Sequence, residues 1–156
     1  MIRMSRLTDY GVVLMSYMAV HPERLHNAAE LAVGARLPLP TVGKLLRVLA
    51  RRDLLVSHRG VKGGYSLAQP PEDISIADII RALEGPIALT VCTTAPARKC
   101  EYEPRCPVRT SWQKINRAVR QALEGITLAD MTGGERRLLS IGNLVTAAHS
   151  AARAVE

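Results

Sequence analysis

The chain has 156 residues, which suits one domain of ordinary size or a small domain with a helical extension. Its 47% hydrophobic content excludes wholesale disorder, and the scarcity of aromatic residues, with no Phe and one Trp, favours an aliphatic helical core. Most of the net charge of +7 comes from residues 36–62, where seven basic residues accompany one acid. Such a concentration indicates a nucleic-acid partner, although a solvated charged surface would give the same pattern.

The apolar run at residues 12–20 is too short to cross a membrane, and no signal-peptide cleavage site follows it. We therefore expect a cytoplasmic protein without a membrane partner, in which cysteines stay reduced. We find no Ser/His/Asp set, paired-carboxylate motif or phosphate-binding loop, so an enzyme with a small-molecule substrate is not expected.

Capping and breaking residues predict three helices in the first part of the chain. Thr8 is a suitable N-cap for a first helix that continues to Val20. Asn27 caps a short second helix, and Pro40 opens a third helix that runs to Arg52. Residues of the third helix that share one apolar face are Val42, Leu45, Leu46 and Leu49.

A hairpin and a fourth helix are predicted next. Two β-like runs, 54–59 and 65–67, flank a glycine-rich turn at 60–64. Ser75 and Asp78 have the spacing of a capping box, and the helix that they open ends at Gly85. The buried stripe of this helix is expected to be Ile76, Ile79, Ile80 and Leu83.

A long amphipathic helix is expected from Pro107 to about Glu124. Its apolar positions are Val108, Trp112, Ile115, Val119 and Ala122. Such a stripe needs a partner, either a second copy of the chain or the chain's own domain. A short helical turn follows at 127–130, and the tail at 133–156 could form one more weak helix to which no role is assigned.

Three helices followed by a hairpin are the order of a winged helix–turn–helix. We therefore predict a mostly α fold, with a DNA-binding domain at residues 1–86, a cysteine-bearing loop at 87–107, a dimerisation helix at 108–132 and a tail at 133–156. The third helix would enter the major groove, and the wing glycines would let the backbone approach DNA closely. Candidate DNA-binding residues are Thr41, Lys44, Arg47, Arg51, Arg59, Lys62, Gly63, Gly64 and Tyr65.

All three cysteines of the chain, Cys92, Cys100 and Cys106, lie in the predicted loop. Thiolates suit iron–sulfur clusters, zinc or Cu(I). Structural zinc sites usually contain closely spaced ligand pairs, whereas seven and five residues separate these cysteines, so a larger inorganic cluster fits better. Three unligated thiols remain an alternative.

Four segments resemble the IscR/NsrR/RirA family of winged-helix iron–sulfur transcriptional regulators. They are LTDYG at residues 7–11, HRGVKGGYSL at 58–67, SIADIIRALEGP at 75–86 and the three-cysteine loop. The wing and the residues after Gly85 look most like the branch that regulates the SUF iron–sulfur assembly system.

The resemblance implies a homodimer that binds a palindromic operator in double-stranded DNA. It also implies a 2Fe–2S or 4Fe–4S cluster on Cys92, Cys100 and Cys106, through which the protein would sense cluster status, redox state or nitric oxide. The targets that this resemblance implies are the SUF assembly genes. The alternative is a regulator that is stabilised by zinc, or one that lacks a cluster and uses redox-active thiols.

A cluster on three cysteines needs a fourth ligand. In the IscR branch a histidine follows the last cysteine by three positions, but here Arg109 occupies that position. In the NsrR branch an acidic residue in the partner's first helix completes the site, and Asp9 stands at the matching place. The resemblance thus points to Asp9 of the partner subunit. A carboxylate there could equally serve only as a charge complement to the helix N-terminus.

Overall fold

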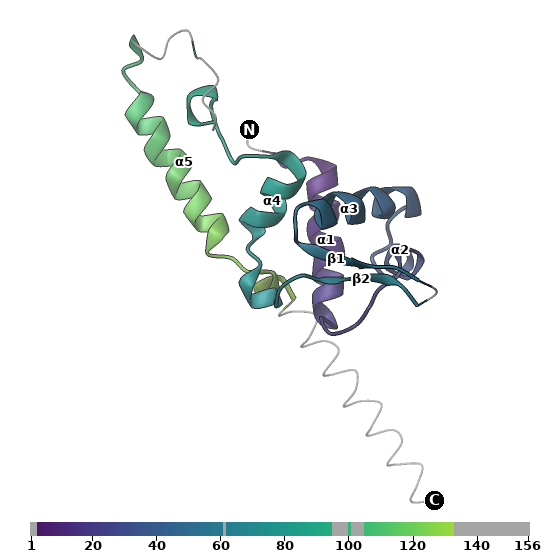
Figure 1. Ribbon diagram of the computed structural model, residues 1–156. Helices are drawn as coiled ribbons and strands as arrows, with labels where there is room; N and C mark the ends of the chain where they lie inside the picture. The colour runs from purple at the N-terminus through teal and green to yellow at the C-terminus, as the bar shows by residue number, and fades with distance from the viewer. Residues whose placement is uncertain (1–2, 61, 95–99, 101–104, 133–156) are drawn as a thin grey trace, which may run out of the picture.

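The structure is a computed structural model that describes residues 3–60, 62–94, 100 and 105–132. Its elements follow in the order α1 (Arg6–Val20), α2 (Ala28–Gly34), α3 (Leu39–Arg51), β1 (Leu55–His58), β2 (Gly64–Leu67), α4 (Ile76–Glu84) and α5 (Arg109–Glu124), with short 3₁₀ helices at Pro71–Asp73 and Val91–Thr93 (Figure 1). The predicted winged helix–turn–helix is confirmed. The predicted tail helix lies outside the described residues.

The start of α1 differs from the prediction. Ser5, not Thr8, is the N-cap, and its hydroxyl oxygen accepts a hydrogen bond from the Thr8 backbone N–H at 3.2 Å. Thr8 lies inside the first turn and is fully buried. Both residue types favour a cap, so the local pattern was ambiguous, and a long-range contact described below explains why Thr8 is buried.

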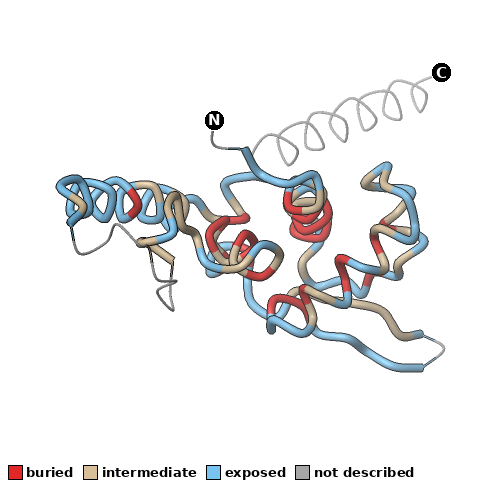
Figure 2. The backbone as a smooth tube through the Cα atoms, turned by 90° about the horizontal axis from the view of Figure 1, so that it is seen from above, coloured by how far each residue is buried: buried red, intermediate tan, exposed pale blue. Residues whose placement is uncertain are grey.

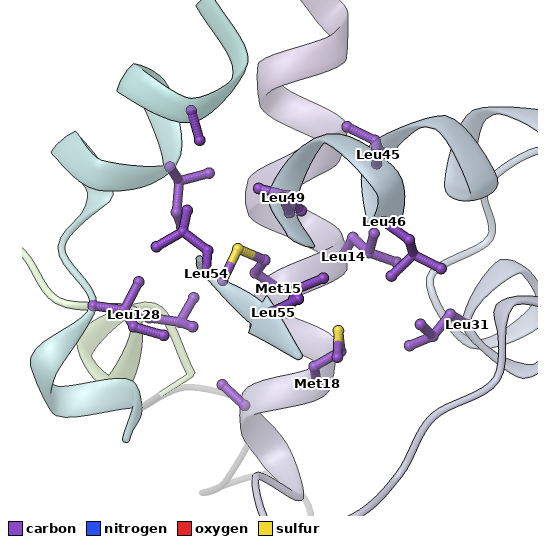
Figure 3. Packing of buried hydrophobic residues seen from close by; sticks show 14 of the residues in the cluster. Leu14, Met15, Met18, Leu31, Leu45, Leu46, Leu49, Leu54, Leu55 and Leu128 are labelled. Carbon is purple, nitrogen blue, oxygen red and sulfur yellow. The ribbon is translucent and has the colours of Figure 1, made fainter. Parts of the chain in front are cut away.

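One aliphatic core joins α1, α3 and α4 (Figure 3). The predicted inner face of α3 is confirmed, since all four of its stripe residues have no exposed surface. Complete burial of one such side chain stabilises the fold by about 1.5–3 kcal/mol. Residues with no exposed surface that meet this face from α1 and α2 are Leu14, Met15, Met18 and Leu31.

The wing is an antiparallel hairpin in which Leu55 pairs with Leu67 and His58 pairs with Gly64. His26, from the segment before α2, adds a further backbone bridge to Tyr65, with N···O distances of 2.9 Å and 2.8 Å. A Cβ atom on Gly64 would lie 2.7 Å from the His26 carbonyl oxygen. A glycine is therefore required at this position for the close approach of two backbone segments.

The capping box of α4 is present as predicted, with reciprocal hydrogen bonds between Ser75 and Asp78. Gly85 ends the helix with a φ of 94°. The predicted helical turn at 127–130 is also present, and it buries Leu128 completely against the core. This turn joins the end of α5 to the main body.

Helix α5 extends away from the main body and is coloured as exposed along most of its length in Figure 2. In the predicted stripe, 38% of Trp112 and 46% of Ile115 are exposed, while Val119 is half-buried. Leu123 packs against the core, and Asn116 is the buried residue of the helix. Within the described chain, the helix packs through one narrow side only, so most of the stripe has no partner. No helix among the described residues is long and apolar enough to cross a membrane.

Candidate nucleic-acid interface and cysteine segment

The outer face of α3 carries the residues of this helix that are predicted to contact DNA. Lys44, Arg47 and Arg51 are exposed, whereas Thr41 is half-buried at the start of the helix. Among the described residues none of these cations has an ion-pair partner. Their charge is therefore uncompensated, which is the condition for strong attraction to phosphate.

The wing places two more exposed cations, Arg59 and Lys62, on either side of its turn. The Gly63 N–H donates to the Gly60 carbonyl at 2.9 Å, which closes this turn. A Cβ atom on Gly63 would lie 2.3 Å from the His58 carbonyl oxygen. Gly63, like Gly64, is thus needed for contacts inside the protein, a reason that differs from the predicted approach to DNA.

Tyr65 has a structural position as well. Its backbone forms the bridge to His26, and its half-buried side chain packs against the core.

The wing tip and α5 lie at opposite sides of the molecule in both views (Figures 1 and 2). The exposed cations of α3 and the wing tip are therefore well separated from most of the exposed face of α5.

The three cysteines are free thiols, and each is half-buried. Among the described residues no three His, Cys, Asp or Glu side chains converge on a point where they could hold a metal ion. The donor chemistry fits an iron–sulfur cluster, because three unpaired soft ligands lie on one connecting segment. The arrangement in a single chain is nevertheless not an assembled site.

Cys92 has the best-defined surroundings of the three. It lies in the 3₁₀ turn Val91–Thr93, with its sulfur 3.2 Å from the Thr90 hydroxyl oxygen. A shallow pocket opens beside it, and its wall on the α5 side includes Arg117 and Arg120. Two guanidinium groups in the wall of one pocket favour the binding of an anionic group there.

Asp9 is exposed in the first turn of α1, and its carboxylate has no hydrogen-bond or ion-pair partner among the described residues. The neighbouring Thr8 donates a hydrogen bond from its hydroxyl to Glu84 Oε1 at 2.6 Å. The Ser5 backbone N–H donates to the same oxygen at 2.8 Å. The first turn of α1 is therefore held at the end of α4, from which the cysteine segment departs.

These contacts also affect the ionisation of Glu84. The hydrogen bond from the Thr8 hydroxyl, followed by the one from the Ser5 backbone, lowers the pKa of Glu84 from its ordinary value of 4.5. The charged carboxylate is thus the form that holds α1 to α4. No local pattern identified this pairing, because its partners are 76 residues apart.

Comparison with known proteins identifies the family. The profile of the Rrf2 family, described as iron-dependent transcriptional regulators, matches residues 4–134. The chain belongs to the Rrf2 family. It is a transcriptional regulator and not an enzyme, which agrees with the absence of catalytic motifs.

Three similar proteins carry three different names, NsrR, IscR and CymR. The HTH-type transcriptional regulator NsrR of Oceanobacillus iheyensis is 28% identical over 139 residues, which are 88% of this chain and 95% of that protein. The structure of T. potens IscR has a TM-score of 0.67 and 31% identity, over 88% of this chain and 90% of that one. The structure of CymR, the global cysteine regulator of B. subtilis, has a TM-score of 0.63 and 28% identity, over 85% and 97%.

Proposed function

We propose that this Rrf2 protein is a homodimeric DNA-binding regulator that senses iron–sulfur cluster status, redox state or nitric oxide through a cluster on its cysteine segment. The observation that carries the proposal is the set of three free, half-buried thiols between the winged-helix body and α5. Likeness to NsrR and IscR supports it. The regulated genes, on the sequence resemblance, are those of SUF cluster assembly. Since the DNA it would bind is in the cytoplasm, the protein acts there.

DNA contact is assigned to α3 and the wing. Lys44 and Arg47 are exposed in the middle of the outer α3 face and would contact the major groove, while Arg51 at the helix end would contact phosphate. Arg59 and Lys62 extend the positive surface at the wing. Thr41, Gly63, Gly64 and Tyr65 support this surface through their positions in α3 and the hairpin.

Dimerisation is assigned to α5. An exposed apolar stripe on a helix that extends from the body is a surface that a second copy can cover by two-fold symmetry. In such a dimer the two α3 helices, here called the reading helices, would face the two halves of a palindromic operator. Residues 108–132 would then form the dimerisation unit and residues 1–86 the DNA-binding unit.

Cys92, Cys100 and Cys106 would hold the cluster, with Asp9 of the partner subunit as the fourth ligand. When bound, the cluster would supply Fe–S chemistry that responds to redox state and to nitric oxide. A carboxylate is a harder and weaker ligand for its iron than a thiolate. The chain's own residues supply the linkage. Glu84 holds the first turn of α1, next to Asp9, and the side chain of Arg81 ion-pairs with Glu124 of α5. A change in the cysteine segment would thus shift the spacing of the reading helices.

The test is the visible absorption spectrum of protein purified without oxygen, together with its iron and sulfide content. A brown wild-type protein and a colourless Cys100→Ala variant are expected. A second measurement compares operator affinity with and without cluster at one salt concentration, because phosphate contacts make affinity salt-dependent. A colourless wild-type protein that contains zinc, or equal affinities of the two forms, would contradict the proposal.

A cluster-free regulator with redox-active thiols is the second candidate. The lack of a converged metal site among the described residues favours it, as does the likeness to CymR. Oxidation by a peroxide would then form a disulfide within the cysteine segment. Mass spectrometry of peroxide-treated, iron-free protein separates this candidate from the first.

A further inference from the structure

Asn116 is exceptional on α5. The rest of the helix is exposed or half-buried, whereas Asn116 is only 8% exposed. A polar side chain that is buried on an otherwise exposed helix has to be satisfied by hydrogen bonds, or its burial would be costly. Its surroundings therefore show what it holds.

The amide of Asn116 contacts the segment that leads to Cys92. Its Oδ1 accepts a hydrogen bond from the Leu89 N–H at 3.0 Å, and its Nδ2 donates to the Ile87 carbonyl at 3.2 Å. This segment belongs to neither a helix nor a strand, so its backbone groups need such partners. One side-chain amide thus pairs with the backbone groups on either side of Ala88, as a neighbouring strand would.

The segment continues to Cys92 through a series of local hydrogen bonds. The Thr93 hydroxyl donates to the Thr90 carbonyl at 2.8 Å, and the Thr93 N–H donates to the same carbonyl at 3.0 Å. The Thr90 hydroxyl in turn lies 3.2 Å from the Cys92 sulfur. Leu89 is therefore bonded directly to α5, and Thr90 and Cys92 follow it in a turn that is held by local hydrogen bonds.

We infer that Asn116 is a positioning residue that holds the Cys92 thiol against α5 before any cluster binds. The inference rests on the proposed function, because it treats Cys92 as a cluster ligand. A preformed ligand position lowers the entropy cost of binding and slows release. Because α5 is also the proposed dimerisation helix, the same amide links the cysteine segment to the dimer interface.

The first experiment uses protein without cluster and measures amide hydrogen exchange of the peptide that contains Leu89. Asn116→Ala removes both hydrogen bonds and is expected to speed exchange of this amide about tenfold. Leu123→Ala is the matched control, because Leu123 packs α5 on the core but makes no hydrogen bond to the cysteine segment. In this control, the Leu89 amide should exchange at the wild-type rate when the two proteins are measured under conditions that give them the same free energy of unfolding.

The second experiment measures the rate at which a chelator removes iron from reconstituted protein under anaerobic conditions. Asn116→Ala should release iron about tenfold faster than the wild type, and Leu123→Ala within about twofold of it. Asn116→Asp keeps the acceptor for Leu89 but loses the donor, so an intermediate rate is expected. It also carries the test if the alanine variant does not fold.

Wild-type release rates and exchange in both Asn116 variants would overturn the inference. So would an equal effect of Leu123→Ala, since Asn116 would then serve stability alone. A wild-type protein that takes up no iron would contradict the proposed cluster instead. In that case, the exchange measurement would still decide whether Asn116 holds the segment that carries Cys92.

Discussion

Replacing Arg51 by Gln should weaken DNA binding in a way that depends on salt. Arg51 ends α3, is exposed, and has no ion-pair partner among the described residues. Neutralising it should therefore leave the fold intact. Because a phosphate contact carries no sequence information, the loss should be equal on operator and on random duplex DNA.

The magnitude follows from counterion release. If all five exposed cations on α3 and the wing contact phosphate on a random duplex, a homodimer makes about ten such contacts, and the slope of log K against log salt is near −9. The Arg51→Gln dimer lacks about two of these, so its slope should be less steep by about 1.8. If binding at 1 M salt is unchanged, this slope difference corresponds to about a 60-fold loss of affinity at 0.1 M.

Fluorescence anisotropy titrations of a labelled random duplex at several salt concentrations measure this slope. Lys114→Gln is the matched control, because Lys114 is an exposed cation on α5, and this helix lies away from the proposed DNA-binding surface of α3 and the wing. The control should keep the wild-type slope. A wild-type slope for Arg51→Gln, or an equal change in both variants, would refute the assignment of DNA binding to α3.

Three further outcomes are expected. Because the folded-state pKa of Glu84 is lowered, its charge stabilises the protein above pH 4.5, and this contribution disappears as pH falls through the folded-state value. The free energy of unfolding in urea should thus be higher for the wild type than for Glu84→Gln at pH 7, and this difference should disappear in acid. A difference that does not change with pH would contradict the reasoning. Gly64→Ala should destabilise the fold by about 1–3 kcal/mol, whereas Gly43→Ala in α3, where a Cβ meets no atom within 4 Å, should stabilise it by about 0.5–1 kcal/mol. Trp112→Glu should convert the proposed dimer to a monomer in analytical ultracentrifugation, and a persistent dimer would exclude this face of α5.

Periodic and capping signals predicted most of the fold. The inner face of α3 was predicted because its apolar residues recur at helical spacing, and the structure buries all four of them. The α4 capping box was visible because its two partners are three residues apart. Local rules failed where the deciding partner is distant, as at Thr8, which Glu84 draws into the first helical turn.

The candidate site was less predictable than the fold. The charge of α3 and the cysteine spacing can be read directly from the chain, but the reason for Gly64 depends on His26, which no local pattern pairs with the wing. Asn116 was also missed. It lies between the apolar positions of α5 as an ordinary polar residue, and only the path of residues 87–89 shows what it binds.

The attachment of α5 to the main body has a mechanical consequence. The helix joins the body at its C-terminal end, through the ion pair between Arg81 and Glu124 and the buried Leu128 (Figure 1). Its 16 residues make a rigid rod about 24 Å long. A rotation of about 5° at this hinge would move the far end, next to Cys106, by roughly 2 Å. If a second chain holds that end in place, the same rotation instead tilts the winged-helix body and changes the distance between the two α3 helices of the proposed dimer.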